Sequence, residues 1–175
     1  MAEVEYRGKQ FTLDEETKEN INNFAGFITA PQSKFGVVFS GMCGNGKTTL
    51  LNAFQSAINY LVDTGKLSRA YGITIVDAKE LAIQASKDEV FDYVKKKEFL
   101  AIEDVGREPS EIVSYGNIFT PIGDILEYRY ANLLFTVLTT NLTPKEMREK
   151  YGYRIADRMN EMFFKIIFKN SSYRQ

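Results

Sequence analysis

One stretch of eight residues constrains this chain more than any other. Residues Gly41–Thr48 read GMCGNGKT and match the phosphate-binding pattern G-x-x-x-x-G-K-[ST]. The β-rich run Gly36–Ser40 precedes the pattern, and apolar residues at helical spacing follow it from Lys47. Glycines let the backbone turn its N–H groups inward, and the following helix adds the positive end of its dipole, so such a loop forms a cradle for phosphate groups. The sequence therefore predicts a strand–loop–helix unit that binds a nucleoside triphosphate.

Individual positions of this loop take their expected roles from the motif. Lys47 is expected to reach the β- and γ-phosphates of ATP or ADP, and the Thr48 hydroxyl to bind Mg²⁺. Cys43 is interpreted as a tolerated loop position rather than as a reactive thiol. Aromatic residues of the N-terminal region are expected to pack in the core, and the functional alternative is that Phe11 or Tyr6 lines an adenine pocket. The further candidates for nucleotide contact are Gly41, Cys43, Gly44, Asn45, Gly46 and Thr49.

Composition and charge exclude several other classes of protein. The 175 residues are 44% hydrophobic and 26% charged, which is ordinary for one globular domain. A net charge of −1 gives no overall attraction to nucleic acid, so any DNA contact requires a local patch. A chain with no histidine and one cysteine makes no structural zinc site, and it fits a reducing cytoplasm. No stretch approaches the ~20 apolar residues of a membrane span, and the acidic start is unlike a signal peptide.

The alternation of strands and helices predicts the fold. Five β-rich runs, at 36–40, 71–76, 98–104, 133–140 and 163–168, are separated by helical patterns. This alternation is typical of an α/β three-layer P-loop NTPase sandwich with a five-stranded parallel sheet. Residues 1–30 are expected to form an N-terminal arm and helix, and residues 31–175 the P-loop core. Ligands of such a sheet bind at the carboxyl ends of its strands.

Several helices carry start signals. A capping box over Thr12–Glu15 predicts a helix directly after it. Asp77 is predicted to cap a later helix, and Thr143 with Pro144 to begin a third. The apolar residues that the first two of these helices are expected to bury are Ile21, Phe24, Phe27 and Ile28, then Leu81 and Ile83.

An apolar strand that ends in two acids is the second chemical element. Glu103 and Asp104 follow the apolar residues 99–102, which is the Walker B arrangement. One carboxylate of such a pair holds Mg²⁺, usually through water, and the other polarises the attacking water. The alternative is a strand that ends at an acidic turn. Asn141 follows the strand 133–140, where its amide could hold a γ-phosphate or the lytic water, or could be a turn residue before Pro144.

The basic residues allow two interpretations. Arg154 and Arg158 stand four residues apart and so share one helix face, where an ordinary surface helix would pair them with Asp157 or Glu161. The run Lys95–Lys97 is interpreted as a solvated helix end that complements the helix dipole, with phosphate contact as the alternative.

Four motifs in this order resemble the AAA+ ATPases of the helicase-loader and transposition-helper clade (DnaC-type and IstB-type). The motifs are the loop at 41–48, FLAIEDVG at 99–106, LTTNL at 138–142 and YGYRIADRM at 151–159. The resemblance covers about residues 20–175. It implies that Asn141 is sensor 1, which orients the lytic water. It also implies that Arg158, with Arg154 beside it, is an arginine finger that reaches the γ-phosphate in a neighbouring subunit.

The same resemblance implies partners. The active form would be a homo-oligomer whose single subunit hydrolyses ATP poorly, and it would act in DNA replication or transposition. A replicative helicase, a transposase or single-stranded DNA would be its partner.

Three departures from the clade matter. Glu103 precedes Asp104 where the clade usually has the aspartate first, so the shorter Asp104 stands in the catalytic place and hydrolysis is expected to be slower. The sequence stops where a C-terminal lid domain would begin, and Arg174 is the candidate to replace the lid's sensor 2. The N-terminal partner-binding domain of the loaders is also missing from this sequence.

Two other functions remain open at this stage. A small-molecule P-loop kinase would need an arginine-rich lid, and the one loop expected to be long enough, 105–120, holds only Arg107. A nucleotide-gated assembly adaptor with little hydrolysis is the other alternative, which the order of Glu103 and Asp104 favours.

Overall fold

The computed structural model describes residues 2–6, 8, 11, 13–31, 33–67, 72–85, 88–114 and 117–173. The helices are α1 (Ala2–Tyr6), α2 (Glu15–Thr29), α3 (Lys47–Asp63), α4 (Ala78–Gln84), α5 (Asp88–Lys95), α6 (Pro121–Ala131) and α7 (Pro144–Met162). The strands are β1 (Gly36–Gly41), β2 (Thr74–Asp77), β3 (Phe99–Val105), β4 (Ile112–Ser114), β5 (Asn117–Phe119), β6 (Phe135–Thr140) and β7 (Phe163–Phe168).

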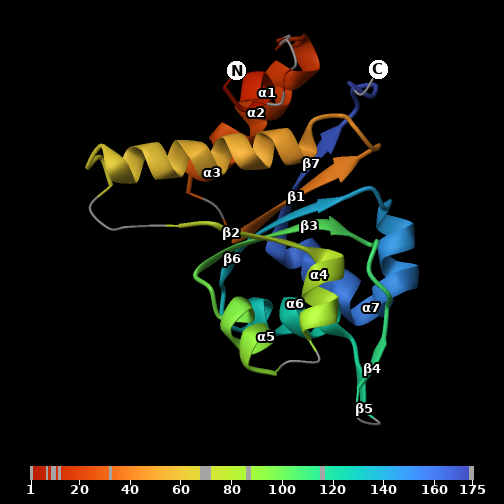
Figure 1. Ribbon diagram of the computed structural model, residues 1–175. Helices are drawn as coiled ribbons and strands as arrows, with labels where there is room; N and C mark the ends of the chain where they lie inside the picture. The colour runs from red at the N-terminus through yellow and green to blue at the C-terminus, as the bar shows by residue number, and fades with distance from the viewer. Residues whose placement is uncertain are drawn as a thin grey trace.

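Five strands form one parallel sheet in the order β2-β3-β6-β1-β7. Helices α2 and α3 cover one face of this sheet, and α4, α6 and α7 cover the other (Figure 1). The predicted α/β three-layer sandwich with a five-stranded parallel sheet is therefore confirmed. No helix among the described residues is long and apolar enough to cross a lipid bilayer.

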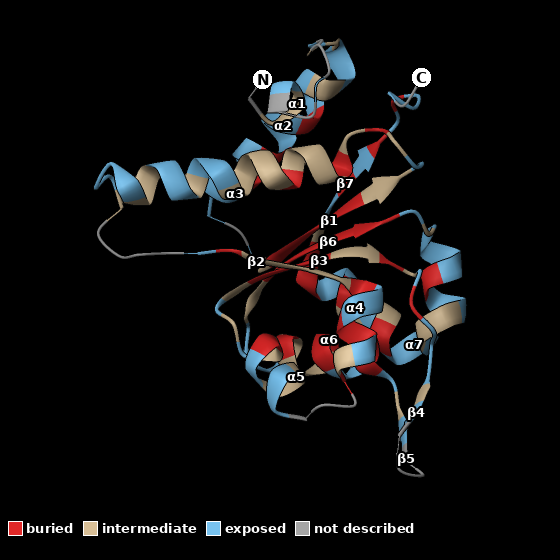
Figure 2. Ribbon diagram, viewed as in Figure 1, coloured by how far each residue is buried: buried red, intermediate tan, exposed pale blue. Residues whose placement is uncertain are grey.

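Each face of the sheet has its own apolar core, because a parallel strand with helices on both sides buries both of its faces (Figure 2). The core under α2 and α3 holds Phe24, Phe27, Val37, Phe39 and Leu51. The core under α4, α6 and α7 holds Leu81, Leu100, Ile102, Ile125 and Met159.

The start of α2 differs from its prediction. Asp14 is the N-cap, and its carboxylate accepts a hydrogen bond from the Thr17 N–H at 2.7 Å. Thr12, the predicted cap, lies outside the described residues. Phe24 and Phe27 are buried as predicted, whereas Ile21 and Ile28 are exposed, because the contact with the sheet is narrower than the apolar stripe of the helix.

Two further predictions are corrected. Residues 105–120 contain the antiparallel hairpin β4–β5 rather than a plain loop. Ile83 is 62% exposed, since it stands two residues after the buried Leu81 and so points away from the core. Residues 2–6 form a short helix, whose Glu3 accepts a hydrogen bond from Asn52 of α3 at 3.2 Å. The predicted start of α7 is confirmed, because Thr143 and Glu146 form a full capping box.

One buried cation joins three elements at the amino edge of the sheet. Arg129 of α6 is fully buried and donates to the carbonyls of Lys95 at 2.9 Å, Lys97 at 2.7 Å and Phe135 at 2.6 Å. Its Nε donates to the Thr136 hydroxyl at 2.7 Å. Burial lowers the pKa of Arg129 to about 10, so the guanidinium remains charged at neutral pH.

Replacing Arg129 with methionine should lower the free energy of unfolding by about 2 to 4 kcal/mol, because buried carbonyls lose their donor. Urea denaturation at pH 7 measures the change. Arg148→Met on the exposed side of α7 is the matched control and should cost less than about 1 kcal/mol. Equal effects of the two variants would contradict a structural role for Arg129.

Asp14 should contribute stability that depends on pH. Hydrogen bonds, the largest from the Tyr173 hydroxyl, hold the pKa of Asp14 below its usual 3.8. A carboxylate with a depressed pKa stabilises the fold above pH 3.8, and that contribution is lost as the pH falls through the depressed value. We expect Asp14→Asn, which keeps the cap but removes the charge, to be less stable than the native chain at pH 7. The difference, at most about 1 kcal/mol, should vanish in denaturation curves near pH 2.

Candidate nucleotide site

The glycine-rich loop lies between β1 and α3, as the sequence predicts. Gly41 approaches β7 so closely that a Cβ there would stand 2.3 Å from the Phe168 carbonyl oxygen and 2.6 Å from Asn45 Nδ2. Only glycine fits this position. Gly46 caps α3 at a φ of 96°, which turns the backbone into the first turn of the helix.

Lys47 is held inside the loop. Its ammonium donates to the carbonyls of Gly41 and Met42, both at 2.7 Å, and to Asn45 Oδ1 at 3.1 Å. Asn45 is itself buried, and its amide donates to the Phe168 carbonyl at 3.0 Å. The cation therefore stands at the predicted phosphate cradle, and its position depends on β7 as well as on the loop.

Sheet topology brings the other candidate residues to this loop. Strand β6 lies between β1 and β3, with Thr140 opposite both Ser40 and Val105. Adjacent strands are about 4.8 Å apart, so the ends of β1 and β3 lie roughly 10 Å apart. Asn141 follows β6 directly and is exposed. The loop, Asn141 and the pair Glu103–Asp104 thus meet at the carboxyl edge of the sheet.

The two acids differ in their surroundings. Ala101 packs in the core under α3 and Ile102 in the opposite core, so strand alternation directs Glu103 to the α3 side, where Thr48 lies in the first turn of the helix. Oε1 of Glu103 is buried. Asp104 lies in a bulge of β3 at a φ of 54°, and its N–H donates to the Thr139 hydroxyl at 2.9 Å. Aspartate adopts this left-handed region more readily than most residues other than glycine, and backbones of this kind cluster at functional positions.

Arg107 contacts the second acid. Its Nη1 lies 2.5 Å from Asp104 Oδ2, and this hydrogen bond raises the pKa of Arg107. The contact is largely open to water, so it is weak and can be exchanged.

The donor set suits a metal ion held together with a nucleotide. Among the described residues, no three or more histidine, cysteine, aspartate or glutamate side chains form a cluster that could hold a metal alone. Mg²⁺ commonly takes one or two protein oxygens and completes its shell with phosphate and water. Thr48 and Glu103, on one side of the sheet, would hold it, and Asp104 stands next to them.

The structure does not bring Arg154 and Arg158 to the glycine-rich loop of the same chain. Both pair with Glu127 of α6, at 2.9 Å and 2.7 Å, and not with Asp157 or Glu161 as the surface-helix interpretation expected. The Arg158 guanidinium also lies 5.3 Å from the ring of Tyr130. The Arg154 side chain is 72% exposed and that of Arg158 is 27% exposed.

Arg158 lies near the amino end of β1, which is the end away from the glycine-rich loop. Lys34, two residues before β1, donates to the carbonyls of Asn160 and Glu161 in the same turn of α7. The six residues of β1 span roughly 20 Å between this turn and the loop. Arg158 is held by Glu127 on the α6 side of this turn and contacts no residue of the glycine-rich loop of its own chain among the interactions described.

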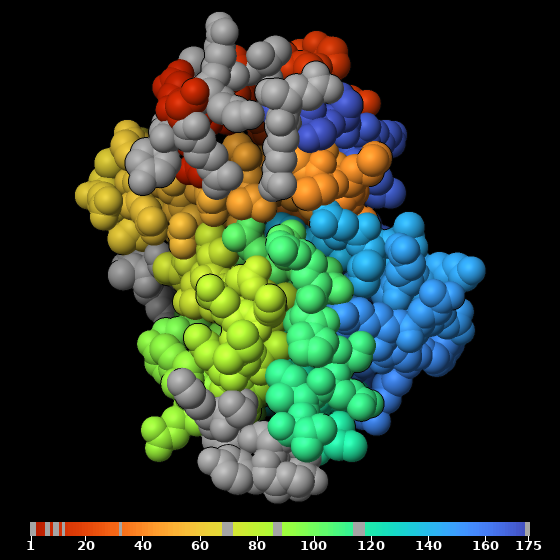
Figure 3. All heavy atoms as spheres, turned by 45° about the vertical axis from the view of Figure 1, so that its right-hand side comes forward, coloured from red at the N-terminus to blue at the C-terminus, as the bar shows by residue number. Residues whose placement is uncertain are grey.

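A buried carboxylate that sequence reasoning missed joins the acidic loop to α7. Glu108 is 2% exposed, and it accepts from the Gly106 N–H at 2.8 Å and from the Tyr151 hydroxyl. Lys150 Nζ lies 3.6 Å from the carboxylate and donates to the carbonyls of Gly106 and Glu108. Burial and the bond to Glu108 raise the pKa of Tyr151. The segment after β3 lies against the first half of α7 (Figure 3), so this cluster holds the loop that carries Arg107.

Other predicted site residues have simpler outcomes. Cys43 is exposed in the loop, Gly44 has a φ of 80°, and Thr48 and Thr49 are half-buried in the first turn of α3. Arg174 lies outside the described residues.

The loop, the strand order and the residues at the carboxyl edge define an α/β fold with a phosphate-binding loop after its first strand. Solved structures of DnaI and of the DnaC helicase loader share it, with 24% and 22% identity and TM-scores of 0.65 and 0.67. Each match covers 91% of this chain, and 88% and 94% of DnaI and DnaC respectively. DnaA from Aquifex aeolicus, bound to AMPPCP, matches at 19% identity and a TM-score of 0.57, over 89% of this chain and 48% of its own. No family model and no curated protein matches the sequence, so the likeness is one of fold. The expected DnaC-like fold is confirmed.

Removing the charge of Glu108 should loosen the segment after β3. We expect Glu108→Gln to lower the free energy of unfolding by about 2 kcal/mol, because Lys150 loses a half-buried partner. The affinity of the loop for ADP should stay unchanged, since Glu108 is not part of the glycine-rich loop. Urea denaturation and calorimetric titration with ADP measure the two quantities. Glu111→Gln, in the exposed part of the same segment, is the control, and an effect of equal size there would contradict the prediction.

Proposed function

We propose that the protein is an AAA+ ATPase that assembles into an oligomer, binds Mg²⁺ and ATP at Gly41–Thr48, and acts with the DNA-replication machinery. One observation carries the proposal: the loop, Asn141 and the acids of β3 meet at one edge of the sheet, while Arg158 pairs with Glu127 of α6, in the turn of α7 that contacts the chain just before β1. A site built this way has its phosphate-binding half in one subunit and needs a cation from the next.

In this site each residue has a defined task. Lys47 and the backbone N–H groups of the loop would bind the phosphates, and Thr48 with Glu103 would hold the metal ion. A bound Mg²⁺ would supply charge neutralisation at the phosphates. Asp104, once released from Arg107, accepts the proton of the lytic water, which Asn141 orients. Glu127 holds Arg158 and Arg154 ready for the neighbouring subunit.

The partners follow from the neighbours in fold. A DnaA structure holds AMPPCP and single-stranded DNA, an ORC1 structure holds DNA, and DnaC is described as a helicase loader. We propose single-stranded DNA and a replicative helicase as partners, with a transposase as the alternative. Lys95 and Lys96 pair with Asp92 of their own helix, which favours a solvated helix end over a DNA contact there.

Subunit mixing tests the shared site. Lys47→Ala should lack a working phosphate site but keep its arginines, and Arg158→Ala should keep the site but lack the arginine. Each variant alone should lose on the order of 100-fold or more in turnover, since an arginine finger contributes 10³–10⁵ in favourable cases. An equimolar mixture should recover activity, and the specific activity of the native protein should rise with its concentration.

Arg148→Ala, on the same helix, is the matched control and should keep native turnover. A mixture that stays inactive, together with a specific activity that does not depend on protein concentration, would contradict a site shared between two subunits.

The contact between Arg107 and Asp104 favours a second candidate, the nucleotide-gated assembly adaptor with little hydrolysis. In that case Asp104→Asn would preserve ATP-dependent assembly and partner binding. Loss of function in Asp104→Asn with assembly intact would exclude the adaptor and leave the ATPase.

A further inference from the structure

Strand β7 leaves one edge of the parallel sheet open. It is the last strand in the order β2-β3-β6-β1-β7, and among the described residues it pairs with β1 alone. The Phe168 carbonyl lies on the β1 side, where it approaches Gly41 and accepts from Asn45. Since the peptide groups of successive strand residues point to opposite edges, those of Lys165 and Ile167 point outward. Beyond the pairing with β1, no backbone hydrogen bond within the described part of the chain involves either residue.

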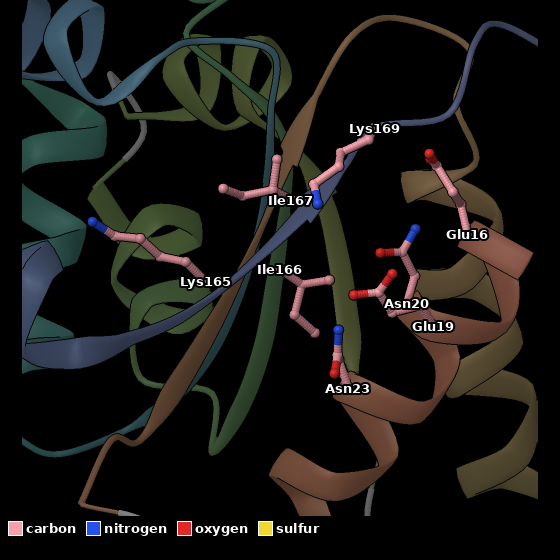
Figure 4. Close-up of a pocket in the computed structure, with 8 residues that line it drawn as sticks. All are labelled: Glu16, Glu19, Asn20, Asn23, Lys165, Ile166, Ile167 and Lys169. Atoms are coloured by element: carbon pink, nitrogen blue, oxygen red, sulfur yellow. The ribbon is translucent and has the colours of Figure 1, made fainter.

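Two clefts lie against this open edge, one on each face of the sheet. On the α2 side, a cleft of about 160 Å³ lies between polar side chains of α2, such as Asn20, and the edge of β7 (Figure 4). On the α7 side, a cleft of about 370 Å³ has a mainly apolar wall that includes Met159 and Phe163. Lys165 and Ile167 line both clefts. A strand added to β7 therefore places alternate side chains in a polar and in an apolar cleft, as in recognition by strand addition.

The α7 face of β7 is apolar and partly uncovered. Phe163, Lys165 and Ile167 share that face, since Phe164 and Ile166 pack on the opposite face, in the core under α2 and α3. Phe163 is buried, whereas Ile167 is 61% exposed. An exposed isoleucine on an open edge beside an apolar cleft is a ready contact for another extended chain.

The charges around the apolar cleft indicate its occupant. Lys145, Arg148 and Lys165 line the cleft together with one acid, Asp157. Neither Arg148 nor Lys165 forms an ion pair with a described residue, and Lys145 pairs only loosely with Glu149, at 3.8 Å. An extended segment with both acidic and apolar side chains complements this cleft. A second copy paired through the same edge does not, because two-fold symmetry brings the same cationic patch of both copies together.

We propose that β7 binds an extended segment of another protein by strand addition. Apolar and acidic side chains of that segment occupy the cleft on the α7 side, and its polar side chains occupy the cleft beside α2. The backbone groups of Lys165 and Ile167 supply the hydrogen bonds, and Arg148 with Lys165 attracts the acids. The inference goes beyond the proposed function and needs no bound nucleotide, so each can fail without the other.

A short synthetic peptide tests the surface on the full chain. The probe reads TITETITE, is capped at both ends and carries fluorescein, and it has isoleucine and glutamate on one face and threonine on the other. It should bind in a fluorescence anisotropy titration, and it should slow the amide hydrogen exchange of Lys165 and Ile167 measured by NMR. The same peptide with N-methyl groups on its central amides keeps its side chains but loses backbone donors, and it should bind at least about tenfold more weakly.

Variants of the edge separate charge from apolar contact. Lys165→Glu should weaken binding of TITETITE about tenfold and strengthen binding of TITKTITK, in which lysine replaces glutamate. Ile167→Lys should weaken binding of TITETITE to a similar extent, because the exposed apolar side chain is lost. Lys66→Glu, at an exposed lysine after α3, makes the same change of net charge and should alter neither titration. Circular dichroism should show all three variants folded, since the replaced side chains are exposed.

Four results would overturn the proposal. Absence of binding by TITETITE would mean that Lys165 only protects the edge from aggregation. Equal binding of the N-methylated peptide would mean that the contact is not strand pairing. Binding of a single-stranded oligonucleotide that Lys165→Glu abolishes, with peptide binding unaffected, would make the edge a nucleic-acid surface. An oligomer of the native chain that Ile167→Lys dissociates in sedimentation would mean that the edge joins copies of this chain.

Discussion

The parallel pairing of β1 with β6 on one side and β7 on the other is the constraint on which the rest of the site depends. It sets Gly41 against Phe168 so closely that no side chain fits between them. The Phe168 carbonyl then accepts from Asn45, and Asn45 accepts from Lys47. The phosphate cradle is therefore braced by the last strand of the sheet. It is not a property of the loop alone.

Two buried charged residues, one at each edge of this sheet, join neighbouring elements through hydrogen bonds. At the amino edge, Arg129 donates hydrogen bonds to carbonyls at the end of α5 and the start of β6. Glu108 ties the segment after β3 to Lys150 and Tyr151 of α7 at the carboxyl edge. Buried charges of this kind are costly unless their partners are all in place, so each specifies one arrangement of the chain more than it adds stability. At the carboxyl edge, that arrangement sets the place of Arg107 beside Asp104.

Much of the fold could be predicted from local patterns, and the errors have a common cause. All five strands of the sheet and the start of α7 follow from runs of apolar residues and a capping box. The hairpin β4–β5 was missed because its strands are three residues each and lie among turn-forming residues. Ile21, Ile28 and Ile83 were wrongly expected to be buried, because helical spacing indicates the apolar face of a helix but not the width of its contact. No sequence pattern indicated the ion pairs of Glu127 and Glu108, since an isolated acid in a helix or loop resembles any surface acid.

The sequence by itself determined that the chain has a phosphate-binding loop, an acidic strand end and an α/β fold, because each depends on residues that are neighbours in the chain. The tertiary structure alone decided which strand ends meet, since strand order depends on contacts between residues some hundred positions apart. It placed Asn141 and Glu103 beside the loop, carried Arg158 to the far end of β1, and returned Tyr173 to Gly44. Hydrogen bonds such as the one from Tyr173 to Asp14 join residues 159 positions apart, and no local pattern encodes such a separation.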